Sequence, residues 1–145
     1  MNNALIEAAL EASRNAHAPY SGFGVGAALL LDDGTIINGC NFENASYGLS
    51  LCAETVALAT ANAAGKLNRV RELAVVGGMI KDGTISGSAI VTPCGRCRQM
   101  LNEAAQLARI DIVVHCASAD LSNIARHKLS DLLPHAFGPA DLGHI

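Results

Sequence analysis

The first part of the chain changes from a helical to a strand-like spacing of hydrophobic residues. Within residues 3–16, leucine and alanine residues recur at helical intervals on one face and charged residues occupy the other, which predicts an amphipathic helix. Apolar residues then run from 23 to 31, and a second strand-like segment covers residues 35–41. Because the turn residues Asp32-Asp33-Gly34 separate these two segments, we predict a β-hairpin.

The central part of the chain alternates predicted helices with predicted strands. Ser50 can cap a helix over residues 51–64, and Pro93 suits the first position of another helix because its φ is fixed and it lacks an N–H. The tail favours a short strand near Ile124 and a short helix near Leu129. The remaining predicted strands cover residues 71–79, 88–92 and 111–116.

Strands that alternate with helices, opened by a hairpin, predict an α/β fold with a mixed sheet and helices on both of its faces. At 145 residues the chain is expected to form one domain, residues 1–145. Half of the residues are hydrophobic but only 3% are aromatic, so the core must be built from Ala, Val, Leu and Ile.

Charge and cysteine content narrow the partners and the compartment. The net charge is -3 and there is no basic run, which argues against DNA or RNA as substrate or partner. No segment is long and apolar enough to suggest a membrane span. Five cysteines without a regular framework spacing fit a reducing compartment, so we predict a cytoplasmic protein.

The candidate chemistry lies in two short motifs, Cys52-Ala53-Glu54 and Pro93-Cys94-Gly95-Arg96-Cys97. Cys94 and Cys97 fall on one face of a helix start, close enough to share a metal ion, and Cys52 supplies a third thiolate near the start of another helix. Three thiolates leave one tetrahedral position open, which is the pattern of a catalytic zinc rather than a structural one. Glu54 is then the base beside the water that fills this position.

Two other interpretations of these cysteines stay open from the sequence. A lone CxxC motif at a helix start after a strand is also the redox site of thioredoxin-like proteins, although such a site needs neither a third thiol nor a carboxylate. Cys40 as a fourth ligand would make a closed, structural zinc site. Such a closed site would belong to a non-catalytic, zinc-stabilised interaction module.

At this point the sequence resembles a known family, the small homotetrameric cytidine deaminases with three cysteine ligands. The resemblance covers nearly the whole chain, in four motifs that occur in the order of the family. They are Tyr20-Ser21-x-Phe23-x-Val25-Gly26-Ala27-Ala28-Leu29; Asn41-x-Glu43-Asn44-Ala45; Cys52-Ala53-Glu54 with Pro93-Cys94-Gly95-x-Cys97-Arg98-Gln99; and Leu132-Leu133-Pro134 with Phe137-Gly138-Pro139.

The resemblance implies a three-layer α/β/α sandwich with a mixed five-stranded sheet, and one Zn²⁺ per chain. It implies deamination of cytidine and deoxycytidine to uridine and deoxyuridine in pyrimidine salvage, with Glu54 carrying protons to N3 and to the departing amine. A deaminase of another aminopyrimidine, such as the antibiotic blasticidin S, shares the zinc motifs and is the alternative.

The resemblance also implies a set of substrate contacts. Strand alternation alone places Asn41 and Glu43 on one face, where they suit either a ribose or a polar strand end entering a turn. In the family these positions hold the sugar, and Phe23 and Ala53 contact the pyrimidine. A homotetramer with composite sites is implied as well, in which Ala45, Tyr47 and Phe137 reach a neighbouring subunit's pocket.

One position departs from the family pattern. Many three-cysteine members have Arg directly after the glutamate, where its charge offsets that of the thiolates, but here the residue is Thr55. We therefore expect the charge balance to rest on the two helix N-termini, with Arg96 or Arg98 as further candidates.

Overall fold

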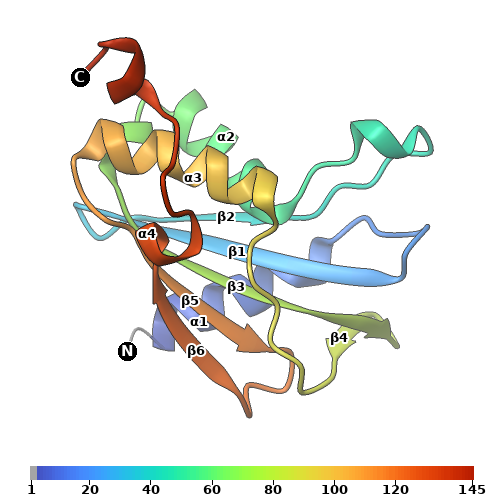
Figure 1. Cartoon of the computed structure of the whole chain (residues 1–145). Coiled ribbons are helices and arrows are strands. Elements are labelled where there is room, and N and C mark those ends of the chain that lie inside the picture. Colours follow the sequence, from blue (N-terminus) through green and yellow to red (C-terminus); the bar gives the residue numbers. More distant parts are fainter. Residues whose placement is uncertain (1–2) are drawn as a thin grey trace.

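The computed structural model describes residues 3–145, which form a mixed sheet between two layers of helices (Figure 1). Its strands run in the order β2-β1-β3-β5-β6, and the short β4 pairs with the end of β3. Among the strand pairs of residues 3–145, β3–β5 is the only parallel one. The strands are β1 (Phe23–Leu31), β2 (Ile36–Cys40), β3 (Val70–Lys81), β4 (Thr84–Ser86), β5 (Val113–Ser118) and β6 (Ile124–Lys128).

Helix α1 (Asn3–Ala12) covers one face of the sheet, and α2 (Ala53–Ala63) and α3 (Gly95–Ala108) cover the other (Figure 1). The predicted three-layer α/β/α arrangement is therefore confirmed. The described part of the chain has no helix with both the length and the apolar character needed to cross a membrane. The shorter helices are α4 (Leu129–Leu132) and the 3-10 turns Ser13–Asn15, Tyr47–Leu49, Leu67–Arg69 and Pro139–Leu142.

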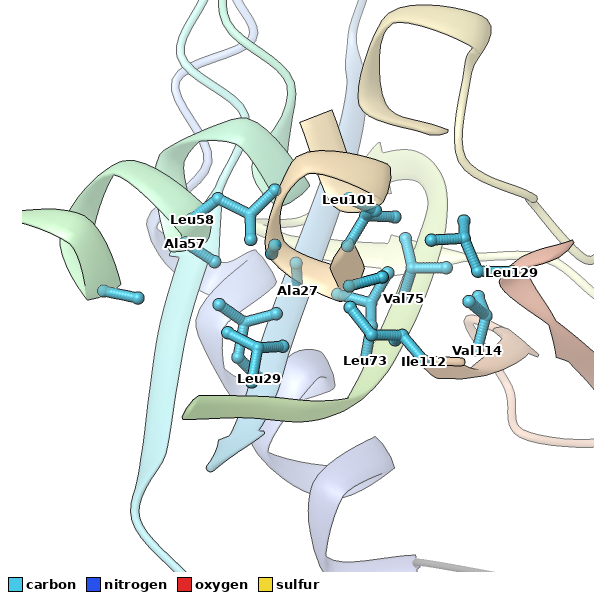
Figure 2. Close-up of a cluster of buried hydrophobic side chains, with 14 of the residues drawn as sticks. Ala27, Leu29, Ala57, Leu58, Leu73, Val75, Leu101, Ile112, Val114 and Leu129 are labelled. Carbon is cyan, nitrogen blue, oxygen red and sulfur yellow. The ribbon is translucent and has the colours of Figure 1, made fainter. Parts of the chain in front are cut away.

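Alternation along the strands sends successive side chains into two separate hydrophobic cores. In β1, Ala27 and Leu29 pack beneath α2 and α3, whereas Ala28 packs toward α1. Figure 2 shows the larger core, in which Leu58 and Leu101 from the helices meet Leu29, Leu73, Val75 and Val114 from the sheet. Aliphatic side chains and alanine dominate both clusters, as the composition predicts.

Two glycines let the helices approach the sheet closely. A Cβ on Gly39 of β2 would lie 2.5 Å from the Ala53 carbonyl oxygen and 2.6 Å from the Ala57 nitrogen, so only glycine allows α2 to pack at this depth. A Cβ on Gly26 of β1 would collide with the Ala9 carbonyl oxygen of α1. Gly39 thus determines how the start of α2 sits on the sheet.

The strand predicted at residues 88–92 is wrong, because this segment forms no strand and runs irregularly into α3. β1 and β5 occupy the two edges of β3, and the free end of β3 is taken by β4, which the sequence analysis missed. The other predicted strands are confirmed with ends shifted by up to about two residues, as expected of any pattern-based boundary.

The two helix starts predicted for the central part are also wrong by two residues. Leu51 exchanges two backbone hydrogen bonds with Phe42, which holds it extended, so α2 begins at Ala53. Ser50 is not its cap, since the Ser50 hydroxyl accepts the Asn44 N–H instead.

The helix predicted over residues 3–16 ends earlier than expected, at Ala12, and the chain continues as a 3-10 turn.

The second of these helices, α3, begins at Gly95 rather than at Pro93. Cys94 takes the cap position in an extended conformation, with ψ 168°. Arg98 then ties the segment before α3 in place, because its guanidinium donates to the Pro93 carbonyl at 2.7 Å and to the Leu132 carbonyl at 3.0 Å. Arg98 is therefore engaged by neutral oxygens of the chain.

Candidate functional site

Three cysteine sulfurs meet where the amino-terminal ends of α2 and α3 converge. Cys52 and Cys94 are the residues that cap the two helices, and Cys97 lies in the first turn of α3. Their Sγ atoms all lie within 4.8 Å of one another, with 3.6 Å between Cys52 and Cys94. Two segments 42 residues apart in the sequence thus bring their thiols together.

The spacing of these sulfurs fits a zinc ion. Two sulfurs bound at about 2.3 Å to a tetrahedral zinc lie about 3.8 Å apart, close to the 3.6 Å between Cys52 and Cys94. A disulfide requires about 2.05 Å, and all three cysteines are free. Among the described residues, Cys40 is not part of this group, so the closed site with Cys40 as fourth ligand finds no support.

Hydrogen bonds within the cluster favour a thiolate at Cys52. The hydrogen bond from Cys97 lowers the pKa of Cys52 to about 6, helped by Cys94 and by the positive charge of Arg96. The same hydrogen bond to Cys52 raises the pKa of Cys97, and burial raises it further. Arg96 donates to the Ser50 carbonyl at 3.0 Å, which holds its charge beside the start of α2.

Thr55, the residue directly after Glu54, contacts Cys97, the buried one of the three candidate zinc ligands. Its hydroxyl lies 3.4 Å from Cys97 Sγ, within hydrogen-bonding distance for sulfur. Cys97 itself is fully buried, so its sulfur depends on such contacts within the chain rather than on water. A neutral hydroxyl thus lies beside the buried sulfur at the position directly after Glu54.

Glu54 is a buried carboxyl beside the sulfur cluster. It is the second residue of α2 and only 4% exposed. Burial raises the pKa of Glu54, and the nearby charge of Cys52 raises it further, against a hydrogen bond with Cys97. A carboxyl group with a raised pKa can both accept and return a proton near neutral pH, which is what an acid/base catalyst requires.

A pocket of about 340 Å³ opens over this cluster. It contains most of the residues singled out from the sequence, and it brings apolar and polar walls together over the thiols and Glu54. The residues predicted from the sequence that line it are Phe23, Asn41, Glu43, Cys52, Ala53, Glu54 and Cys94.

Comparisons with known proteins agree with this geometry. The family model described as "Cytidine and deoxycytidylate deaminase zinc-binding region" matches residues 1–115. The cytidine deaminase of Mycobacterium tuberculosis is 41% identical over 142 residues, covering 97% of this chain and 92% of that protein. The chain belongs to the cytidine deaminase family.

Other members of the family resemble the chain to a similar extent. The cytidine deaminase of Halalkalibacterium halodurans is 41% identical over 138 residues, which is 95% of this chain and 95% of that protein. The crystal structure of cytidine deaminase from Burkholderia pseudomallei superposes with a TM-score of 0.80 at 42% identity, covering 94% of this chain and 100% of that one. Sequence, fold and cysteine cluster therefore all point to this zinc-binding deaminase family.

Asn41 and Glu43 serve the fold of this deaminase as well as its pocket. Asn41 Nδ2 donates to the Phe23 carbonyl at 2.8 Å, and its Oδ1 accepts the Val25 N–H at 2.8 Å. Glu43 accepts the N–H groups of Tyr20 and Ser21 on one oxygen and the Ser21 hydroxyl on the other, at 2.5 Å, which lowers the pKa of Glu43. Any bond to a ligand must use their remaining capacity.

Three predicted contact residues do not line the pocket within the chain. Tyr47 is 73% exposed, and its ring lies 5.6 Å from that of Tyr20. Phe137 is 60% exposed on the α3 side, where Gln99 and Asn102 donate to its carbonyl oxygen. Ala45 is exposed in the loop between β2 and α2.

Sequence reasoning missed several residues that complete the pocket. Ser50 and Leu51 line it because the chain stays extended before α2, and Val91 and Thr92 line it because their segment is irregular rather than a strand. Val25 belongs to the quoted motif but was given no role. The alternation of β1, which places Val25 on the same face as Phe23, was the signal that could have found it.

Proposed function

We propose that this protein hydrolyses cytidine and deoxycytidine to uridine and deoxyuridine, with release of ammonia, as a cytoplasmic enzyme of pyrimidine salvage. The observation that carries the proposal is the buried Glu54 carboxyl, which shares one pocket with Cys52 and Cys94 of the three-sulfur cluster. Deamination at C4 of cytosine needs an activated water and a group that moves protons between that water and the base.

Cys52, Cys94 and Cys97 would hold one Zn²⁺ per chain, and the zinc would lower the pKa of a water molecule in the pocket. The chain contributes the charge balance. Thiolate at Cys52 is favoured by Arg96, and the Cys97 sulfur can accept a hydrogen bond from Thr55. The unpaired N–H groups at the starts of α2 and α3 add partial positive charge at the same point.

Glu54 is the proton carrier in this proposal. Its carboxylate takes a proton from water and passes protons to N3 of the pyrimidine and to the amine at C4. The oxygen of water forms the new bond to C4, the C4–N bond breaks, and the products are uridine and ammonia. A pKa raised by burial suits the group that must give these protons back.

The remaining pocket residues would orient the nucleoside. Phe23 and Ala53 suit the base, since both line the pocket that also contains Glu54. Asn41 and Glu43 would hold the sugar hydroxyls with the hydrogen-bonding capacity that their contacts to the backbone leave free. Because a depressed pKa keeps Glu43 ionised, it would accept hydrogen bonds from the sugar.

We also propose a homotetramer whose pockets are completed by neighbouring chains. The segment between β2 and α2, which supplies Glu43, Ser50 and Leu51 to the pocket, also exposes the apolar side chains of Phe42, Tyr47 and Leu49, and a neighbouring chain could cover them. Ala45, Tyr47 and Phe137 would then reach the pocket of another chain. Activity should fall with dissociation in a dilution series followed by gel filtration, and a fully active monomer would refute this assembly.

The first test is ammonia release from cytidine by the purified, zinc-loaded protein, with blasticidin S in parallel. We expect Glu54→Gln to lose at least about 100-fold in kcat, the scale of one positioned acid/base group, and to keep its zinc. Glu7→Gln is the matched control, because Glu7 is an exposed carboxylate on α1, on the opposite face of the sheet.

Each result of this test has one meaning. Release from cytidine supports the proposed substrate, whereas release from blasticidin S alone replaces it. Near-normal turnover by a zinc-replete Glu54→Gln variant would remove Glu54 from the mechanism. Zinc bound with no release from either compound would overturn the proposed activity.

A further inference from the structure

Gly77 is a residue of β3 that presents no side chain toward the wall of the pocket. It pairs with Val25 of β1, and it follows Leu73 and Val75 on the face of β3 that packs toward α2 and α3. Its φ is not in the left-handed region, so the backbone does not require glycine here. The reason for glycine at this position is space.

Three side chains fill the space that a methyl group would occupy. A Cβ on Gly77 would lie 2.9 Å from Val91 Cγ2, 3.1 Å from Phe23 Cε1 and 3.3 Å from Val25 Cγ2. All three distances are shorter than ordinary van der Waals contact, so at least one neighbour would have to move. Phe23 and Val25 come from β1, and Val91 comes from the irregular segment before α3.

The same three side chains form an apolar wall of the pocket. These side chains lie between the sheet at Gly77 and the pocket. A side chain pushed away by a Cβ on Gly77 would therefore move away from the sheet and into the pocket. Because Gly77 has no side chain, these three side chains lie closer to the sheet and leave more room in the pocket.

We propose that Gly77 is a specificity-determining residue, which sets the depth of the Phe23-Val25-Val91 wall and so the size of the ring that the pocket admits. The inference rests on the proposed function for the identity of that ring, a pyrimidine. Gly77 touches no reacting atom. It acts through the wall residues, in the way that small changes of pocket volume alter selectivity.

The test is Gly77→Ala, with kcat and KM for cytidine measured on zinc-replete protein. We expect KM to rise about tenfold, the effect of about one methylene in a binding pocket, with kcat changed much less. The double variant Gly77→Ala with Val91→Ala removes the nearest clashing group, and we expect it to recover most of the lost affinity.

Gly24→Ala is the matched control. Gly24 lies in β1 beside Phe23, and a Cβ there would be 2.8 Å from Ile85 Cγ2, on the face that packs toward α1. This variant crowds the same end of the sheet without touching the pocket wall. We expect it to lower the stability of the protein and to leave KM within about twofold of the wild-type value, because the pocket keeps its shape.

Two outcomes would overturn the proposal: an unchanged KM for Gly77→Ala, or an equal loss in Gly24→Ala and Gly77→Ala with no recovery in the double variant. If wild-type protein releases no ammonia from cytidine, the proposed function fails by itself. The crystal structure of Gly77→Ala then decides the role of Gly77. Movement of Phe23 or Val91 into the pocket supports it, and an unchanged pocket overturns it.

Discussion

At the scale of single residues, no arginine follows Glu54 to offset the negative charge that three zinc-bound thiolates would carry. Thr55 and Arg96 are the residues placed to offset it. The Thr55 hydroxyl can donate to the Cys97 sulfur, and Arg96 places its charge near Cys52. Arg98, the other candidate, is held by the backbone oxygens of Pro93 and Leu132. The negative charge of the sulfurs would thus be offset by the Thr55 hydroxyl dipole on α2 and by the Arg96 charge on α3.

We expect Thr55→Val to weaken zinc binding about tenfold, as loss of a hydrogen bond to a metal ligand commonly does. Competition with a chromogenic chelator measures this affinity without reference to activity. Thr60→Val is the control, because the Thr60 hydroxyl donates only to the Val56 carbonyl on the exposed face of the same helix. Equal affinities in the two variants would leave the charge balance to Arg96 and the helix ends.

Residue-level chemistry was the part most readily predicted from the sequence. Cys52, Cys94, Cys97 and Glu54 stand at spacings that only a few kinds of site use, so their meeting could be expected before the fold was known. Thr55 was recognised as a departure, but its contact with Cys97 depends on how α2 and α3 cross, and no local pattern contains that information.

At the scale of elements, the local pattern predicted which secondary structure each segment prefers. It did not show whether a strand edge was free for the segment to pair with. Residues 23–31 alternate and form β1 as predicted. Residues 88–92 also contain a run of apolar residues, yet neither edge of β3 was free for them, and Val91 and Thr92 line the pocket instead. The error fell on a segment that lines the candidate site, and functional sites are where local and global preferences often disagree.

The contact between α2 and β2 gives an element-scale prediction. Gly39→Ala places a methyl group against the backbone of Ala53 and Ala57, which cannot rotate away, so α2 must shift. We expect the free energy of unfolding to fall by about 1–3 kcal/mol, the usual effect of overpacking. Urea denaturation measures the loss.

Gly48→Ala is the matched control for this prediction, since a Cβ there meets nothing within 4 Å. We expect the Gly48→Ala variant to unfold at the same urea concentration as the wild-type protein. Wild-type stability in Gly39→Ala would mean that the helix is free to slide on the sheet, and that the start of α2 is positioned by something other than this contact.

At the scale of the whole molecule, the three sulfurs connect two halves of the chain that the sheet also holds together. The hairpin and α2 precede β3, and α3 and the last strands follow it. A metal ion bound by Cys52, Cys94 and Cys97 would therefore resist separation of α2 from α3, and its removal should be felt in global stability.

We expect removal of zinc by a chelator to lower the melting temperature. At a free zinc concentration 100-fold above Kd, binding adds about 2.7 kcal/mol to the free energy of unfolding. A protein of this size gains about 2–4 °C per kcal/mol, so the shift should be about 5–10 °C. Calorimetry with and without chelator measures it, and identical transitions would show that the site does not stabilise the fold.

The position of two cysteines at helix caps has a consequence for backbone dynamics. Neither Cys52 nor Cys94 forms a side-chain cap hydrogen bond, although both occupy the residue where a serine or aspartate oxygen would secure the first turn. A sulfur fixed by a metal ion would hold that turn, whereas a free thiol would let it fray. Deuterium uptake by the amides of these two turns would therefore report how much of the protein carries its metal.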